Sequence, residues 1–403
     1  MAVPKIRIKD FESEWMSGII GNISNSFSGG TPTAGNHNYY GGNIPFIRSG
    51  EIHSDKTELF LTEEGLNSSS AKLVDKGNIL YALYGATSGE VDVSKIGGAI
   101  NQAILAILPK DNINKYFLCY LLQNKKEHIV NSLIQGGQGN LSGALIKSYL
   151  VNFADITEQE AISNYFQSLD LLIEATGKKI ATLKQTKQAS LQSMIPQEGA
   201  TKPRVRFKGF TDEWKNIELS ELFDFYKGRG LSKEKLNSKG QFNCILYGEI
   251  FTKYDFVVND CISKTDIQEG FPSVCGDIIM PGSTTTSGID LAKAVYVPFN
   301  EVLYGGDIIV LRPKIPKYIN SFFIATLISC INRENIAMVS QGTTIVHLHA
   351  HNIAGLIYLI PSVEEQAKIA EYFSNLDKQI FIQEQRLDKL KQIKSACLKN
   401  MFV

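Results

Sequence analysis

Two stretches of the chain, residues 158–194 and 365–401, place apolar side chains at alternating steps of four and three residues. This 3.5-residue period is typical of a coiled-coil seam, and it continues for about five heptads in each stretch. A helix of about 38 residues is ~57 Å long at ~1.5 Å per residue, which exceeds most helices of globular domains. The expected seam residues are Ile162, Phe166, Leu169, Ile173, Ile180 and Leu183 in the first stretch, and Ile369, Phe373, Leu376, Ile380, Leu387 and Leu390 in the second.

Polar residues interrupt the two seams at equivalent steps. Thr176 matches Gln383, and Lys187 matches Lys394. Polar seam residues fix the register of a coiled coil at some cost in stability. We therefore expect the two helices to pair antiparallel and to separate two globular domains. The alternative is that each helix packs only on its own domain, which the strict 3.5-residue period disfavours.

The segments between the helical stretches contain short apolar runs. Residues 78–84, 103–108, 277–280 and 307–311 read as buried strands. Amphipathic spacing predicts helices near residues 114–131 and 318–332. Because strands and helices do not alternate regularly, the expected fold class is α+β.

The chain also repeats itself. Pro4, Arg7, Phe11 and Trp15 recur 199 residues later as Pro203, Arg206, Phe210 and Trp214. Further matches are Glu158-Gln159 with Glu365-Gln366, Leu169-Asp170 with Leu376-Asp377, Gly50-Glu51-Ile52 with Gly248-Glu249-Ile250, and Gly77-Asn78-Ile79 with Gly276-Asp277-Ile278. The two halves match at their ends and differ in the segments between them. Such a pseudo-two-fold repeat predicts that one scaffold is used twice to recognise two different targets. The scaffold that the two halves share is called the frame. The repeated Arg7 and Arg206 are expected to have a structural role in this frame. Phe11, Trp15, Phe210 and Trp214 are expected to anchor the hydrophobic cores.

Composition excludes several classes of protein. A chain of 403 residues predicts two or three domains, and a hydrophobic share of 43% excludes disorder as a global description. No apolar run approaches the ~18 residues of a membrane span, and the first residues lack the apolar segment of a secretory signal. The six cysteines form no CxxC pair, so we expect a cytoplasmic protein with reduced thiols. The 41 basic residues balance 41 acidic ones, which neither indicates nor excludes nucleic-acid binding.

Motifs of catalysis are missing from the sequence. It contains no P-loop, no GxSxG, no HExxH and no Asp/Pro-Pro-aromatic motif of amino-methyltransferases. His347, His349 and His351 form the one histidine cluster, but no nearby carboxylate or cysteine completes a metal site. We therefore expect neither catalytic residues nor a metal in this chain.

Several features occur together and in duplicate: the Pro…Arg…Phe…Glu-Trp openings, and Glu-Gln followed by Tyr-Phe and Leu-Asp on a long helix. With the loop Ser28-Gly29-Gly30-Thr31-Pro32, this constellation resembles the specificity subunit of type I restriction–modification systems over essentially the whole chain. The resemblance implies a non-catalytic subunit whose target-recognition domains each read one half of a bipartite, asymmetric DNA site. It implies domains at residues 1–155 and 197–361, and conserved spacer helices at 156–196 and 362–403.

The resemblance also implies partner subunits. Modification (methyltransferase) subunits, two in number, would clasp the coiled coil, and restriction (nuclease/translocase) subunits would join them. The assembled complex would be a site-specific DNA adenine methyltransferase and a type I restriction endonuclease. S-adenosylmethionine, ATP and Mg would belong to the partner subunits, and no cofactor is expected in this chain.

Candidate DNA-binding residues are polar side chains in glycine-flanked loops, where recognition residues concentrate. They are Ser28, Thr31, Arg48, Tyr84, Thr87, Ser88, Gln135, Gln138 and Asn140 in the first half, and Lys227, Arg229, Lys233, Tyr247, Lys253, Ser283, Thr284, Gln341, Thr343, Thr344 and His347 in the second. Arg48 and Arg229 are the strongest candidates, because Arg can bind guanine bidentately. The Ser-Gly-Gly-Thr-Pro loop becomes Lys227-Gly228-Arg229-Gly230 in the second half, so the family pattern does not carry over there.

Two other classes of function stay open at this point. The chain could be a coiled-coil adaptor with two domains that bind proteins or glycans, or a stand-alone DNA enzyme. The missing motifs disfavour the enzyme. Salt dependence separates the other two, because a DNA binder loses affinity steeply as salt rises.

Overall fold

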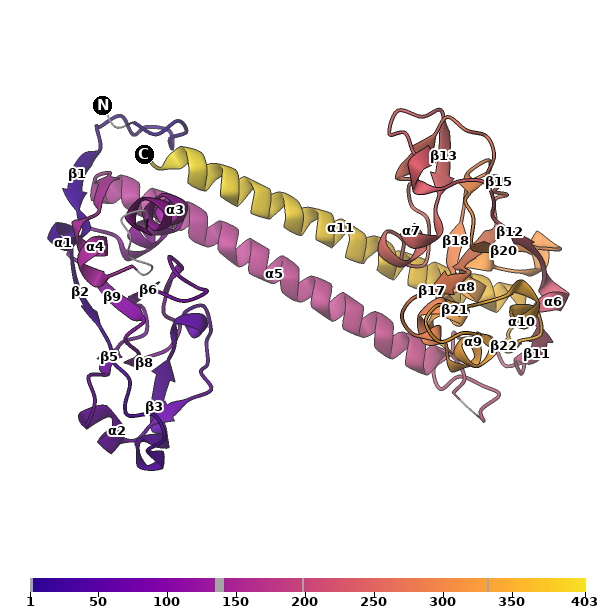
Figure 1. Cartoon of the computed structure of the whole chain (residues 1–403), viewed down its shortest axis with the longest axis horizontal. Coiled ribbons are helices and arrows are strands. Elements are labelled where there is room, and N and C mark those ends of the chain that lie inside the picture. The colour runs from indigo at the N-terminus through magenta and orange to yellow at the C-terminus, as the bar shows by residue number, and fades with distance from the viewer. Residues whose placement is uncertain (1–2, 135–140, 198, 332) are drawn as a thin grey trace. The chain divides into compact units, whose positions relative to one another are not determined.

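The computed structural model describes residues 3–134, 141–197, 199–331 and 333–403. The chain divides into two compact units. The first unit contains residues 1–179 and 383–403, and the second contains residues 180–382. Both units are mixtures of short strands and helices, so the predicted α+β class is confirmed (Figure 1).

The first unit contains two four-stranded sheets and a two-stranded one. Their orders are β2-β9-β6-β7, β4-β3-β8-β5 and β1-β10. The strands are β1 (Met16–Ile19), β2 (Ser24–Ser28), β3 (Tyr40–Ile47), β4 (Phe60–Leu61), β5 (Lys72–Val74), β6 (Ile79–Ala82), β7 (Val91–Val93), β8 (Gly98–Ile100), β9 (Ile104–Pro109) and β10 (Leu150–Phe153). The helices are α1 (Ile20–Ile23), α2 (Glu63–Asn67), α3 (Lys115–Ile134), α4 (Gly143–Ser148) and the beginning of α5 (Ile156–Met194).

The second unit repeats this topology. Its equivalent sheets have the orders β12-β20-β16-β18, β14-β13-β19-β15 and β11-β22, and β17 additionally pairs with β21. The strands are β11 (Lys215–Glu218), β12 (Phe223–Lys227), β13 (Phe242–Ile245), β14 (Ser263–Thr265), β15 (Phe271–Pro272), β16 (Asp277–Pro281), β17 (Ser283–Thr284), β18 (Val295–Val297), β19 (Leu303–Tyr304), β20 (Ile308–Pro313), β21 (Val346–His347) and β22 (Ile357–Ile360). The helices are α6 (Leu219–Leu222), α7 (Tyr247–Thr252), α8 (Ser321–Cys330), α9 (Arg333–Val339), α10 (Ala350–Ala354) and the beginning of α11 (Val363–Met401).

The four buried strands expected from apolar runs are β6, β9, β16 and β20. The expected helix near residues 318–332 is α8, which ends at Cys330 and is followed by the separate α9. Helices α3 and α8 both follow an asparagine. Asn114 Oδ1 accepts from Phe117 N at 3.2 Å, and Asn320 Oδ1 accepts from Phe323 N at 3.0 Å. This capping interaction explains why an asparagine precedes the equivalent helix in each half.

The long helices pair antiparallel inside each unit. In the first unit Tyr165 Oη lies 3.3 Å from Cys397 Sγ, and Asp170 forms an ion pair with Lys394. In the second unit Tyr372 Oη lies 2.9 Å from Ser190 Oγ, and Asp377 pairs with Lys187. Burial raises the pKa of Asp377, and the Lys187 ammonium opposes that rise.

The expected seam residues are buried or half-buried along both helices. Ile162, Phe166, Leu169, Ile180, Ile369, Phe373, Leu376 and Ile380 are buried, and Ile173, Leu183, Leu387 and Leu390 are half-buried. Each unit contains one end of α5 and the opposite end of α11. The boundary between the two compact units therefore lies within both helices. The expected division into whole domains and whole spacer helices stays a prediction.

The repeated arginines and glutamates form the same ion pair in each unit. Arg7 Nε and Nη2 donate to Glu158 at 2.8 and 2.7 Å, and Arg206 makes two bonds of 2.6 Å to Glu365. The glutamate side chains are almost fully buried. Trp15 is also buried and donates to Glu158 at 3.2 Å. The conserved spacing of the repeat thus serves the frame, as expected.

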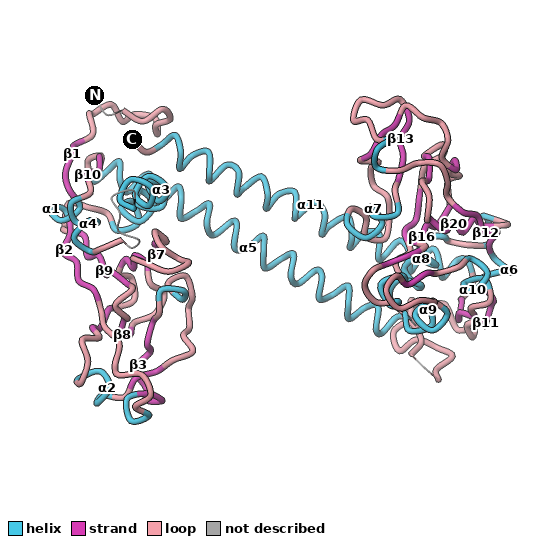
Figure 2. The backbone as a smooth tube through the Cα atoms, in the orientation of Figure 1, coloured by secondary structure: helices cyan, strands magenta, loops and turns pink. Residues whose placement is uncertain are grey.

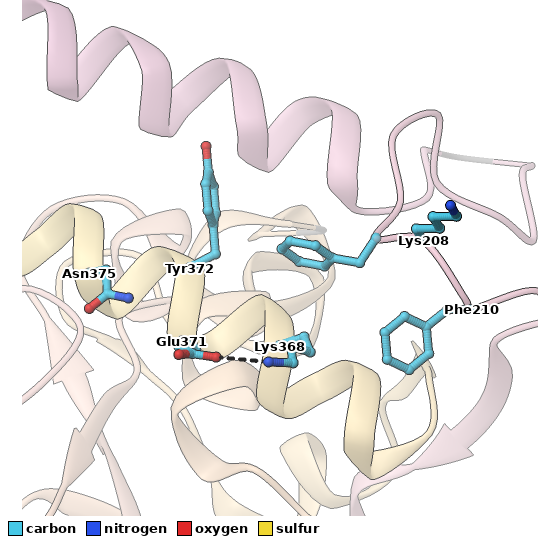
Figure 3. A pocket seen from close by; sticks show the side chains of 7 residues that line it. Lys208, Phe210, Lys368, Glu371, Tyr372 and Asn375 are labelled. Atoms are coloured by element: carbon cyan, nitrogen blue, oxygen red, sulfur yellow. Dashed lines mark hydrogen bonds and ion pairs between the residues drawn. The ribbon is translucent and has the colours of Figure 1, made fainter.

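Aromatic packing completes the base of each unit. Trp15 packs against Phe117 with ring centroids 5.6 Å apart, and Trp214 packs against Phe323 at 5.9 Å. Both tryptophans are core residues, whereas Phe11 and Phe210 are only half-buried. Phe210 instead lines a pocket of about 500 Å³ at the beginning of α11 (Figure 3).

That pocket belongs to the frame. In Figure 3 the side chain of Tyr372 points toward the neighbouring helix α5, where Ser190 lies. Lys368 and Glu371, one turn apart on α11, form an exposed ion pair at 3.4 Å. None of the candidate DNA-binding residues lines this pocket.

Figure 2 shows that loops account for much of both units outside α5 and α11. Among the described residues no single helix has the length and apolar character to cross a membrane. Helices α8 and α9, which are bent relative to each other, reach that length and apolar character only when they are taken together.

Candidate nucleic-acid interface

In the first unit, loops from four segments surround the turn between β8 and β9, residues 101–103. We call segments 28–31, 47–49, 83–88 and 141–143, with this turn, the first loop cluster. Its backbone bonds run from Gly30 N to Ile100 O (3.1 Å), Asn101 N to Ile47 O (3.3 Å), Leu83 N to Ala103 O (2.8 Å) and Leu141 N to Leu83 O (3.1 Å). Two of these bonds hold the turn residues Asn101 and Ala103 directly, and the other two hold the neighbouring Ile100 and Leu83.

The second unit builds the same cluster around the turn between β19 and β20, residues 305–307. Segments 227–230, 245–247, 282–287 and 347–350, with this turn, form the second loop cluster. The equivalent bonds run from Arg229 N to Tyr304 O (3.3 Å), Gly305 N to Ile245 O (2.9 Å), Gly282 N to Asp307 O (2.8 Å) and Leu348 N to Gly282 O (2.8 Å). The backbone is therefore shared, while the side chains it presents are different.

Glycines permit the close approach of the first loop to the turn in each unit. A Cβ on Gly29 would lie 1.9 Å from Ile100 O, and one on Gly228 would lie 2.0 Å from Gly305 O. Only glycine fits at these two equivalent positions. The next residue differs, because a side chain at Gly30 would collide with Ser70, whereas Arg229 is exposed. The two loops thus share their backbone path and differ in the group that they project.

Six of the candidate residues of the first unit lie in the first loop cluster. Ser28 ends β2 and is half-buried, and Thr31 is exposed with its hydroxyl donating to Gln102 Oε1. Tyr84, Thr87 and Ser88 are half-buried in segment 83–88, and Arg48 follows β3. Gln135, Gln138 and Asn140 lie outside the described residues.

Arg48 is already paired within the protein. Its Nη2 lies 2.8 Å from a carboxylate oxygen of Glu51 and 2.8 Å from one of Glu58. Burial alone would raise the pKa of Glu51, but hydrogen bonds from Arg48 and nearby backbone groups outweigh it and lower this pKa to about 2. The same bonds raise the pKa of Arg48. A contact between Arg48 and DNA would therefore have to compete with two carboxylates.

Glu51 also explains a repeated motif. Glu51 Oε2 accepts from Arg48 N at 3.0 Å, and the equivalent Glu249 Oε2 accepts from Leu246 N at 2.8 Å. Each glutamate closes the short helical turn at the end of β3 or β13. Gly-Glu-Ile thus recurs because it shapes a loop of the cluster.

The second loop cluster gathers most of the other candidates. Lys227 and Arg229 are exposed at the end of β12, and Tyr247 begins α7 with 43% of its surface exposed. Ser283 and Thr284 are buried, and their hydroxyls bond to Asp307 and Thr286. These two hydroxyls serve bonds within the cluster.

A hairpin extends the second cluster. Gln341 N donates to His347 O at 2.9 Å, and His347 N donates to Gln341 O at 2.7 Å. Gln341, Thr343, Thr344 and His347 are all exposed on it, and β21 pairs with β17. Lys233 and Lys253 are exposed as well, but neither lies in the cluster segments. The DNA-binding assignments of all these residues stay predictions.

The histidine cluster is a stack of exposed rings. His347 and His349 have ring centroids 6.4 Å apart, and His349 and His351 are 5.6 Å apart, with 9° between the planes in both pairs. Within the part of the chain that the structure describes, no three His, Cys, Asp or Glu side chains are arranged to hold a metal ion.

Sequence reasoning missed the turn residues at the centre of each cluster. Asn101 and Gln102 occupy the first turn, and Asp307 occupies the second. Their neighbours in the clusters come from distant segments, so periodicity could not single them out. The one signal in the sequence is that polar residues lie within the three positions before the buried strands β9 and β20.

Comparison with known proteins bears on these duplicated clusters. A family model described as "Type I restriction modification DNA specificity domain" matches residues 12–185 and again 211–392. The MjaIX specificity subunit, a type I restriction enzyme subunit of Methanocaldococcus jannaschii, is 22% identical over 414 residues, covering 96% of this chain and 92% of the relative. The MjaVIII specificity subunit of the same organism is 19% identical over 342 residues, covering 81% and 78%.

Solved structures agree in fold. The crystal structure of the type I restriction–modification S subunit from M. genitalium has a TM-score of 0.66 and 17% identity, and covers 100% of this chain and 99% of that one. The first match ends within α5 and the second within α11, so each match covers one set of sheets with its loop cluster and most of the long helix that follows. The chain therefore belongs to the family of type I restriction–modification DNA specificity subunits and carries the specificity domain twice.

Proposed function

We propose that this chain is the sequence-specific DNA-recognition subunit of a type I restriction–modification complex, and that each loop cluster reads one half of a bipartite, asymmetric site. One observation carries the proposal: the same loop cluster is built twice with different side chains. Gly30 corresponds to Arg229, and Asn101-Gln102-Ala103 corresponds to Gly305-Gly306-Asp307. A shared backbone with different projecting groups is what reading two unlike half-sites requires.

The partners follow from the family and from the chain's own surface. Leu171 and Leu172 on α5, and Phe381 and Ile382 on α11, are exposed apolar residues outside the seam. Such residues favour burial against another protein. We propose that two modification subunits bind along these helices and that restriction subunits join the assembly in the cytoplasm.

Catalysis is assigned to those partners. The sequence contains no methyltransferase or nucleotide-binding motif, so the chain is proposed to be a non-catalytic subunit. S-adenosylmethionine, ATP and Mg would then bind to the modification and restriction subunits, which would perform adenine methylation and DNA cleavage.

The test is to co-express the chain with its modification subunit in a host that lacks other methyltransferases, and to map N6-methyladenine across the host DNA. A single split motif is the expected result. A host that remains unmethylated, or a continuous motif, would contradict the proposal. The coiled-coil adaptor class predicts no preference among duplexes at any salt concentration, so a steep salt dependence of duplex binding separates the two readings.

A further inference from the structure

The central turn of each loop cluster is held in place by main-chain hydrogen bonds within the proposed interface. Segments from four other parts of the chain bond to it or to its neighbours through main-chain groups. A side chain on such a turn is presented from a fixed backbone, which base recognition needs. The turn residues Gln102 and Asp307 differ in chemistry, and neither belongs to the frame of the repeat.

Gln102 is exposed at the tip of the first turn. The hydroxyl of Thr31 donates to its Oε1, which restricts the orientation of the carboxamide. An amide oxygen has two lone pairs and the amide nitrogen has two hydrogens, so both remain able to meet a base. Adenine offers an N6 donor beside an N7 acceptor in the major groove, which is the complement of a glutamine carboxamide.

Asp307 is the last residue of the second turn, where the first turn has Ala103, and it carries a carboxylate one position after the equivalent of Gln102. Its backbone has φ = 62°, a conformation that aspartate and asparagine tolerate better than most residues. Ser283 Oγ donates to Oδ2, and a Cβ added to the neighbouring Gly306 would meet no atom within 4 Å. The residue before Asp307 therefore borders open space, while Asp307 itself is half-buried and its Oδ1 lies next to Gly282.

A carboxylate near DNA is repelled by phosphates, so a role in general backbone binding is excluded for Asp307. It can, however, accept a hydrogen bond from the N4 amino group of cytosine. The exposed Arg229, whose backbone N bonds to Tyr304 O next to the turn, supplies a positive charge in the same cluster. This combination favours a base edge over a phosphate as the partner of Asp307.

We propose that the two turns are base-reading elements, with Gln102 reading an adenine in the first half-site and Asp307 reading a cytosine in the second. The proposal rests on the proposed function, since it presumes a bipartite DNA target. It assigns specificity to residues outside the Ser-Gly-Gly-Thr-Pro loop and its counterpart.

The test uses the complex of the full chain with its modification subunit and duplex oligonucleotides that carry the wild-type target. Each position of both half-sites is varied through all four base pairs. Gln102→Ala should weaken binding roughly 5- to 150-fold for the duplex with adenine at one position of the first half-site, and abolish the preference there. Preferences in the second half-site should not change.

Asp307→Asn is the sharper variant. Asparagine keeps an oxygen acceptor for Ser283 and tolerates the positive φ, so the turn is retained. Because asparagine pairs with adenine, the preference at one position of the second half-site should move from cytosine toward adenine. A purely structural role for Asp307 would leave the order of the four base pairs unchanged.

Matched controls lie at the opposite ends of the same strands. Asn112→Ala removes an exposed carboxamide beyond the end of β9, and Glu301→Gln removes an exposed charge before β19. Both should leave all preferences as in the wild type. If Gln102→Ala or Asp307→Asn weakens every duplex equally, or changes no preference, the inference is overturned. If the wild-type complex itself shows no preference, the proposed function fails instead.

Discussion

The ion pair between Arg206 and Glu365 allows a quantitative test of what holds the second unit together. Glu365 is 1% exposed and Arg206 is 15% exposed, with two bonds of 2.6 Å between them. Removing one partner of a buried pair typically costs ~3–5 kcal/mol, because the other charge is left uncompensated. Arg206→Ala leaves the carboxylate of Glu365, the more buried of the two groups, without its partner. We therefore expect the loss of unfolding free energy to be near the upper end of that range.

The neutral variant should cost less. Glu365→Gln leaves the more exposed arginine unpaired, and an amide can still accept one bond from it, so we expect ~1–3 kcal/mol. The double substitution Arg206→Met with Glu365→Leu removes both charges. Replacing a buried pair with apolar residues of similar volume is often close to neutral, so the double variant should be more stable than Arg206→Ala.

Hydrogen–deuterium exchange of the assembled complex measures these effects locally. Slowly exchanging amides of β11, β22 and the beginning of α11 should exchange about 150- to 5,000-fold faster in Arg206→Ala, the factor that corresponds to ~3–5 kcal/mol. The equivalent pair, Arg7 with Glu158, provides an internal control, since peptides of the first unit should be unaffected. Equal costs for Arg206→Ala and the double variant would refute the argument from an uncompensated charge.

Three further predictions address the loop clusters. Gly228→Ala should destabilise the second unit by ~1–3 kcal/mol and weaken recognition of the second half-site, since the new Cβ would lie 2.0 Å from Gly305 O; unchanged thermal unfolding and binding would contradict this. The pKa of Glu51 is lowered to about 2 from 4.5 by its bonds to Arg48, so its ionised form stabilises the first unit above pH 4.5, and this contribution is lost as pH falls toward 2. The stability difference between wild type and Glu51→Gln, measured by thermal unfolding at several pH values, should therefore shrink over that window. Replacing residues 20–155 with the same region of another family member should change only one half of the methylated motif, and a change in both halves would argue against independent recognition.

The long helices and the repeat could be predicted from the sequence alone. A seam with a 3.5-residue period depends only on spacing along one helix, so Phe166 and Phe373 could be placed in it without a structure. The buried strands β6 and β20 were also predictable, because a continuous apolar run indicates burial on both faces. Arg7 and Glu158, by contrast, are 151 residues apart, and only their repetition indicated a role in the frame.

The composition of the loop clusters was decided by tertiary structure. Gln102 and Thr31 are 71 residues apart, and Asp307 lies beside Ser283 only because β16 and β20 pair in one sheet. The sequence also could not indicate that Arg48 is held by Glu58, since that bond depends on how the chain returns after β3. Helical periodicity is encoded locally, residue by residue. A recognition surface is assembled from loops whose proximity depends on strand pairing across the whole unit, and spacing along the chain carries no record of it.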